Sequence, residues 1–241
     1  LQKSINLPMI SQKLMHVITK SGLGGAQRYV LDCAQADIAK QIDTVIVSDA
    51  KKGWLYQQAL AKQINYQAIH HLDRNINIIN DFFSMVELYK IIRKEKPTHL
   101  YLNSSKISFI GALIGKICGL KDIVYTVHGW VFNEPMPWFK KQLYINIEKI
   151  SAHWKDKIIF INHFDLEIAK KLSIGKPEQY SLINLQIESI SFLKKEEAKM
   201  ILGSKVGQNF TNKKIVGTIA NFFSTKNLDA LIDIAQQLKE V

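Results

Sequence analysis

Cysteine is scarce in this sequence. Only Cys33 and Cys118 occur among the 241 residues, which is too few for a disulfide framework. The two thiols lie far apart in the sequence, and the adjacent His70 and His71 have no ligand pattern near them, so no metal site is expected. The scarcity of cysteine predicts a protein of a reducing compartment such as the cytoplasm.

Long apolar runs are also missing. No stretch reaches the roughly 18 uninterrupted apolar residues typical of a membrane helix, and the most apolar candidate, residues 107–120, is interrupted by Lys116. The first residues lack the charged-then-apolar order of a secretory signal. We therefore expect a cytoplasmic protein that does not cross a bilayer, either free or at the inner face of the membrane.

Acidic residues are fewer than basic ones. The sequence has 21 Asp and Glu against 32 Lys and Arg, which gives a formal net charge of +11. Such an excess indicates an anionic partner, namely nucleic acid, an acidic membrane surface or a phosphorylated small molecule. Nucleic acid is the least favoured, because aromatic and basic residues do not cluster on a short sheet or a recognition helix.

Short β-rich runs alternate with longer amphipathic stretches. This alternation predicts an α/β fold, with a Rossmann-like, doubly wound parallel sheet covered by helices on both faces. Strands are expected at residues 13–19, 44–48, 66–69, 99–103, 122–127, 157–161 and 180–183. Seven strands are enough for one complete sheet.

A stripe of apolar residues at helical spacing precedes the fourth predicted strand. Its members are Ile79, Phe82, Phe83, Val86 and Tyr89. Core-facing helices ordinarily show such a stripe, so these aromatic residues are predicted to pack in the core and receive no functional role.

The pattern changes after residue 183. A connector that includes a short charged helix at 194–202 is followed by a new strand at 214–220 and a final amphipathic helix that begins near Leu228. The chain is thus predicted to hold an N-terminal domain, 1–190, and the opening of a second Rossmann-like domain, 191–241. One strand and one helix bury too little apolar surface to be stable alone.

A glycine-rich run, Ser21-Gly22-Leu23-Gly24-Gly25-Ala26, joins the first predicted strand to the first helix. Glycines let the backbone approach a ligand, and a helix N-terminus offers unpaired N–H groups to a phosphate. A dinucleotide fingerprint would have a small residue at position 27, where this chain has Gln27, so a nicotinamide enzyme is disfavoured. A glycine turn without a ligand remains the alternative.

His128 follows the fifth predicted strand. In open parallel sheets the ligand crevice lies outside the carboxyl ends of the strands, so this histidine is the strongest single candidate for a site residue. A structural hydrogen-bonding role is the commoner use of a lone histidine at such a place.

Several segments together resemble the family 4 retaining glycosyltransferases of the GT-B fold, in particular bacterial members that build capsular, O-antigen or exopolysaccharide chains. The run HVITKSGLGGAQR at 16–28 is similar to the first strand and glycine loop of that family. The similarity continues, in order, with LNSSKISFIG, YTVHGWVF, FINHFD, IGKPE, SLIN, IVGTIAN and TKNLDALI.

This resemblance implies a glycosyltransferase that moves a sugar from a nucleotide diphosphate sugar to a cell-surface polysaccharide or lipid-linked acceptor with retention. It places Gly24 and Gly25 near the donor phosphates and His128, the catalytic candidate, near the transferred sugar. Lys226 would contact the donor diphosphate, although a lysine at a helix start is most often merely solvated. No cofactor is implied beyond the donor.

The resemblance also suggests an acceptor side. Ser104, Ser105 and Lys106 follow the fourth predicted strand and would line it, while Arg74 would meet an anionic acceptor. Capping of the next helix is an equally good explanation for the two serines.

The sequence departs from the family pattern at three places. Asn221 replaces an arginine, Asn227 replaces a glycine, and Asn184-Leu185 stands where an Asn-Gly pair is usual. The later pair of glutamates that holds the donor would lie beyond Val241. The alternative function is therefore a truncated, non-catalytic binding or partner subunit of a glycosyltransferase.

The segment 137–157 bears on membrane contact. Its predicted apolar face consists of Phe139, Leu143, Ile147, Ile150 and Trp154. Around that face lie Trp138, Lys140, Lys141, Lys149, Lys155 and Lys157. Such a helix can pack on the core and still touch lipid head groups, whereas a plain solvated lysine face is the commoner meaning.

Overall fold

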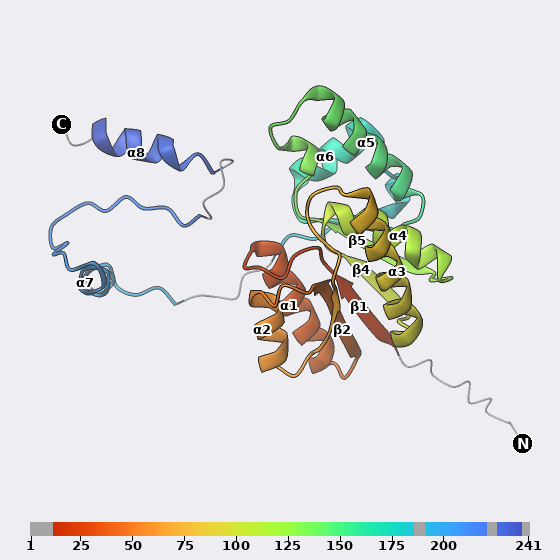
Figure 1. The fold of residues 1–241 in the computed structure, drawn as a ribbon. Coiled ribbons are helices and arrows are strands. Elements are labelled where there is room, and N and C mark those ends of the chain that lie inside the picture. Colours follow the sequence, from red (N-terminus) through yellow and green to blue (C-terminus); the bar gives the residue numbers. More distant parts are fainter. Residues whose placement is uncertain (1–11, 186–190, 221–225, 238–241) are drawn as a thin grey trace, which may run out of the picture. The chain divides into compact units, whose positions relative to one another are not determined.

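The structure is a computed structural model that describes residues 12–185, 191–220 and 226–237 (Figure 1). The chain divides into two compact units, Leu1–Asn184 and Leu185–Val241. The division falls a few residues before the predicted boundary at residue 190. Each unit is described by itself below.

A seven-stranded sheet forms the first unit, in the order β3-β2-β1-β4-β5-β6-β7. The strands are β1 (Lys13–Val17), β2 (Asp43–Asp49), β3 (Asn65–Ile69), β4 (His99–Leu102), β5 (Asp122–Val127), β6 (Lys157–Phe160) and β7 (Tyr180–Leu182). Every neighbouring pair is parallel, and Met15 of β1 lies in register with Val45 on one side and Leu100 on the other. The predicted doubly wound sheet is confirmed.

Helices cover both faces of this sheet. They are α1 (Gly25–Ala39), α2 (Trp54–Ala61), α3 (Ile78–Glu95), α4 (Ser105–Ile117), α5 (Trp138–Ala152) and α6 (His163–Leu172), with 3-10 turns η1 (Val131–Asn133) and η2 (Pro177–Gln179). Along β2, Ile46 joins the apolar cluster beneath α1 and α2, whereas Val45 and Val47 join the cluster beneath α3 to α6. Alternate side chains of one strand thus feed two separate cores, as a sheet buried on both faces requires.

Two glycines bring α4 close to the sheet. A Cβ atom at Gly111 would collide with Leu102 Cδ2, and one at Gly115 would lie 2.8 Å from Ile123 Cδ1 and 2.9 Å from Leu100 Cδ2. Glycine permits this approach without a shift of the neighbouring side chains, and it lets the second half of α4 lie close to β4 and β5.

The prediction that the apolar stripe of α3 packs in the core is wrong. Ile79 is 69% exposed, Phe82 61% and Phe83 46%, while the buried face of the helix carries Ser84, Leu88 and Ile92. The helix has apolar residues on two faces, and periodicity alone does not reveal which face the sheet covers. The prominent aromatic stripe is therefore on the surface.

The apolar face predicted for α5 is likewise largely exposed, because Phe139, Leu143 and Ile150 each show more than half of their surface to solvent. A polar network occupies the buried side of this helix instead. Lys155, predicted as a surface base, is fully buried, and its ammonium group lies 3.1 Å from Glu148 Oε2 and 4.4 Å from the centre of the Tyr125 ring. The desolvation that Lys155 suffers is offset by this carboxylate.

The second unit contains two helices among its described residues, α7 (Lys195–Val206) and α8 (Leu228–Gln237). Both were predicted. The strand predicted at 214–220 is absent, since these residues have no regular structure and Val216 and Ile219 are exposed. A strand is stable only when a neighbour pairs with its backbone, and the described part of this unit contains no other strand.

Candidate functional site

Three polar segments meet at the carboxyl edge of the sheet. They follow β1, β4 and β5, which are consecutive strands of the sheet with β4 in the middle. The strand order reverses between β1 and β4, because the chain runs outward through β2 and β3 and then returns to β4 on the other side. Ligands of open α/β sheets bind at this reversal.

The glycine loop after β1 is anchored by hydrogen bonds to residues at and after the end of β2. The buried carboxylate of Asp49, at the end of β2, accepts hydrogen bonds from the backbone N–H of Ser21 at 3.0 Å and from its hydroxyl. Ser21 Oγ in turn accepts a bond from Gly53 N, and Ser21 O accepts one from Leu55 N. The start of the loop is thereby fixed to the turn between β2 and α2.

The start of α1 is open. Gly24 stands at the N-cap position, no side chain caps the helix, and its first turn holds no acidic residue. A Cβ atom at Gly25 would meet no atom within 4 Å, so there is free space beside the first turn. Uncapped N–H groups and the positive end of the helix dipole together suit a phosphate group.

His128 lies beside this helix, at the end of β5. Its ring contacts the Tyr29 ring of α1, with centroids 5.0 Å apart. Burial lowers the pKa of His128 to about 4, because desolvation disfavours the imidazolium form. His128 is therefore neutral near pH 7 and acts there as a hydrogen-bonding group rather than as a cation.

Asn103 is a candidate site residue that the sequence analysis did not single out. This buried side chain directly follows β4, donates through Nδ2 to Tyr101 O, and places Oδ1 3.5 Å from His128 Nε2. Because an amide oxygen only accepts, the contact favours the tautomer with hydrogen on Nε2 and leaves Nδ1 as an acceptor. The sequence analysis counted Asn103 as the last residue of the strand predicted at 99–103, and a polar side chain at that strand end was the available signal.

Ser104 links two of the strand ends. It occupies the N-cap position of α4, but its hydroxyl makes no capping bond and instead lies 2.6 Å from Thr19 Oγ1 and accepts a bond from Thr19 N. Ser105 begins α4 and is partly exposed. The capping explanation thus fits the position of Ser104 but not the bonds of its side chain.

Both predicted acceptor-side cations are paired with carboxylates. Arg74 Nη2 donates to the two oxygens of Glu134 at 2.7 and 2.9 Å. Lys106 Nζ contacts Asp81 Oδ1 and donates to Asn75 O, and its side chain is only 11% exposed. These contacts join the loops before α3 and α5 to the first turn of α4.

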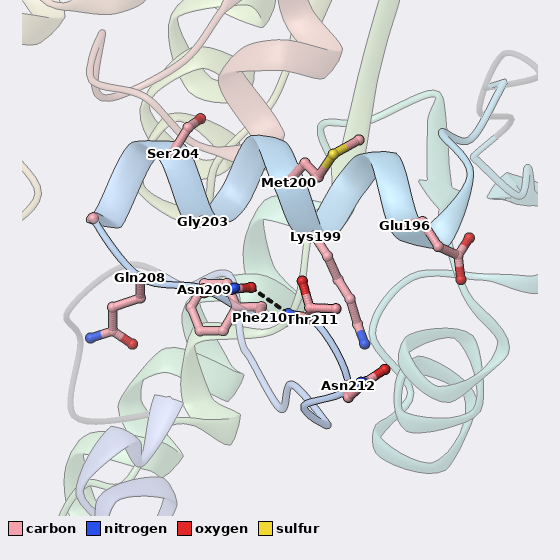
Figure 2. A pocket seen from close by; sticks show the side chains of 11 residues that line it. Glu196, Lys199, Met200, Gly203, Ser204, Gln208, Asn209, Phe210, Thr211 and Asn212 are labelled. Carbon is pink, nitrogen blue, oxygen red and sulfur yellow. Dashed lines mark hydrogen bonds between the residues drawn. The ribbon is translucent and has the colours of Figure 1, made fainter.

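Lys226 lies in the second unit and is exposed. Asn221 lies outside the described residues. The second unit also has a hollow beside α7, lined by Lys199, Gly203 and residues 207–212 (Figure 2). Asn209 Oδ1 accepts a bond from Thr211 N at 2.8 Å there, and no predicted site residue lines this hollow.

Within the described ranges, no three His, Cys, Asp or Glu side chains gather in a way that would hold a metal ion. None of the described helices combines the length and hydropathy that crossing a bilayer requires.

The topology, the glycine loop and the open helix start define a Rossmann-like α/β domain of the nucleotide-binding type. The chain belongs to Glycosyltransferase Family 4, whose pattern matches residues 23–183. The roles predicted for the individual site residues stay predictions.

Relatives and solved structures agree with this assignment. The chain is 28% identical, over 171 residues, to the Escherichia coli enzyme UDP-Gal:alpha-D-GlcNAc-diphosphoundecaprenol alpha-1,3-galactosyltransferase, covering 71% of this chain and 44% of the relative. The Anabaena protein HepE, solved with UDP and glucose, matches this chain with a TM-score of 0.72 at 16% identity. The match covers 94% of this chain and 58% of the HepE chain. A Rickettsia africae glycosyltransferase has a TM-score of 0.62 at 14% identity, with coverages of 82% and 50%. The chain thus spans about half the length of these proteins, and the shared fold is that of GT-B glycosyltransferases.

Proposed function

We propose that this chain forms the acceptor-side domain, and the beginning of the donor-side domain, of a glycosyltransferase that transfers a sugar from a nucleotide diphosphate sugar with retention. The observation that carries the proposal is the open N-terminus of α1 next to the neutral His128. The family membership supports the reaction class.

In the proposed reaction the donor diphosphate lies beside Gly24 and Gly25, where backbone N–H groups stabilise the charge that develops on the leaving group. His128 bonds a hydroxyl of the transferred sugar and so orients it, while Asn103 holds the imidazole ring. Lys226, which belongs to the second unit, stays a predicted contact of the donor diphosphate. Orientation and charge stabilisation, without a protein nucleophile, would carry the catalysis.

The acceptor is proposed to be a lipid-linked glycan or a growing polysaccharide at the inner face of the membrane. The E. coli relative is named for an acceptor linked to diphosphoundecaprenol, which supports the lipid-linked alternative. Ser104, Ser105 and Arg74 are the proposed acceptor contacts, and what supports them is that Ser104 directly follows Asn103, whose side chain contacts His128.

The test is a calorimetric titration of the folded chain with a panel of nucleotide sugars and free nucleotides. We expect saturable binding of one donor and a roughly tenfold weaker Kd for His128→Ala, as the loss of one well-placed hydrogen bond would give. The matched control is His153→Ala, because His153 is exposed and its Nδ1 contacts only carbonyls of its own helix. Absence of binding across the panel would instead favour the non-catalytic partner subunit.

A further inference from the structure

The N-terminal ends of α3 and α5 expose large apolar side chains. On α3 they are Ile78, Ile79, Phe82 and Phe83, and on α5 they are Trp138 and Phe139. Between 46% and 85% of each side chain is open to solvent. We call these six residues the α3–α5 face.

The two parts of this face belong to one end of the first unit. Both helices follow strands of a parallel sheet, so both begin at its carboxyl edge, and each packs against α4 (Figure 1). The ion pair of Arg74 and Glu134 joins the loops that precede α3 and α5, and Lys106 joins the start of α4 to Asp81 on α3. The starts of the three helices are therefore tied together at the carboxyl edge of the sheet, which is also the edge that carries the candidate site.

The charges around the face are unequal. Two of the acids there have cationic partners, since Asp81 pairs with Lys106 and Glu134 with Arg74, while Glu87 accepts a hydrogen bond from the backbone N–H of His70. Lys140 and Lys141 of α5 are exposed, and neither makes an ion pair with any residue in the part of the chain that the structure describes. The net charge is therefore positive next to the apolar side chains.

We propose that the α3–α5 face docks the protein on an anionic lipid surface. Phe, Ile and Trp side chains at helix ends would enter the boundary between head groups and acyl chains, while Lys140 and Lys141 bind lipid phosphates. This proposal rests on the proposed function, because docking by this face turns the edge that carries His128 and Ser104 towards an acceptor whose lipid is held in the membrane. A purely apolar partner surface would not explain the basic residues.

The experiment is flotation of the full chain with vesicles of pure phosphatidylcholine or of phosphatidylcholine with phosphatidylglycerol. We expect binding to the anionic vesicles, at least roughly tenfold weaker binding for Ile79→Ser/Phe82→Ser and for Trp138→Ser/Phe139→Ser, and a smaller, salt-dependent loss for Lys140→Gln/Lys141→Gln. The matched controls are Leu60→Ser and Ile117→Ser, because these side chains are 65% and 61% exposed and lie at the C-terminal ends of α2 and α4.

Equal binding of the face variants and the wild type would overturn the proposal, as would equal binding to neutral and anionic vesicles. If the wild type does not bind vesicles but forms a dimer, and the face variants are monomers, the face would instead bind a second copy of the chain. The same variants are also titrated with the nucleotide-sugar panel. If the face variants lose vesicle binding but keep donor binding, the docking proposal is supported. If vesicle binding depends on the face but no protein binds a donor, only the proposed transferase function is contradicted.

Discussion

Asp49 and Ser21 are joined by two hydrogen bonds to a single carboxylate oxygen, and both residues are buried. Asp49 ends β2, whereas Ser21 begins the glycine loop after β1. Two adjacent strand ends are thereby locked together directly beneath the open start of α1. The position of the proposed phosphate-binding loop thus depends on a residue that does not itself face the free space.

Replacement of Asp49 tests this anchoring role. In Asp49→Ala the buried N–H of Ser21 loses its acceptor, and we expect a loss of about 1–3 kcal/mol in the free energy of unfolding. The exposed Asp32, which pairs with Arg28 one turn earlier in α1, provides the control, since Asp32→Ala should cost less than about 0.5 kcal/mol. Urea denaturation measures both variants. Equal stabilities would show that the anchor contributes nothing.

Alanine substitution at two glycines separates stability from ligand binding. Gly25→Ala should leave the free energy of unfolding within about 1 kcal/mol of wild type, because its Cβ meets no neighbour, yet the methyl group would occupy the space proposed for a donor phosphate and weaken nucleotide-sugar binding. Gly111→Ala should cost about 1–3 kcal/mol through collision with Leu102. Thermal unfolding and calorimetric titration of both variants check these expectations. Unchanged donor affinity in Gly25→Ala would place the phosphates elsewhere.

The strands and the glycine loop were predictable because their signals are local. A run of β-branched residues indicates a strand, and glycines at its end indicate a loop, from only a few neighbouring positions. The exposure of the α3 stripe was not predictable. That helix has two apolar faces, and which of them is buried depends on how the helix packs on the sheet in the folded chain. Lys155 was missed for another reason: its burial depends on Ser108, which is 47 residues away in the sequence and reaches its side chain only in the folded chain. The strand expected at 214–220 lacks a pairing partner among the described residues.

The buried pair of Lys155 and Glu148 should show strong coupling. Burial lowers the pKa of Lys155, so the charged form persists because of the adjacent carboxylate. We expect Lys155→Met and Glu148→Leu each to cost about 3–5 kcal/mol, since either change leaves one group buried without its partner. The double variant should be close to wild type in stability. A double-mutant cycle by chemical denaturation measures the coupling energy, and additive losses would contradict it.

A separate ion pair at the surface provides the comparison. Lys116 and Asp156 form a pair of which both side chains are more than a third exposed. Their cycle should yield a coupling energy below about 1 kcal/mol. The contrast between the two pairs isolates the effect of burial from that of charge.

The low pKa of His128 predicts how stability depends on pH. The folded-state pKa of about 4 lies below the ordinary value of 6.5, so between these two pH values the unfolded chain binds more protons than the folded chain. The stability that neutral His128 retains above pH 6.5 is therefore lost as the pH falls towards 4, by about 3 kcal/mol in total. His128→Asn keeps a polar group but does not titrate, so its stability should fall less steeply over this range. The matched control is His163→Asn, which alters an exposed ring that makes no ion pair among the described residues and should follow the wild type. Denaturant unfolding at several pH values compares the three proteins, and a direct titration of His128 by NMR should give a midpoint near 4. A midpoint near 6.5 would mean that the ring is solvated, which would remove the basis for treating it as a neutral hydrogen-bonding group at the site.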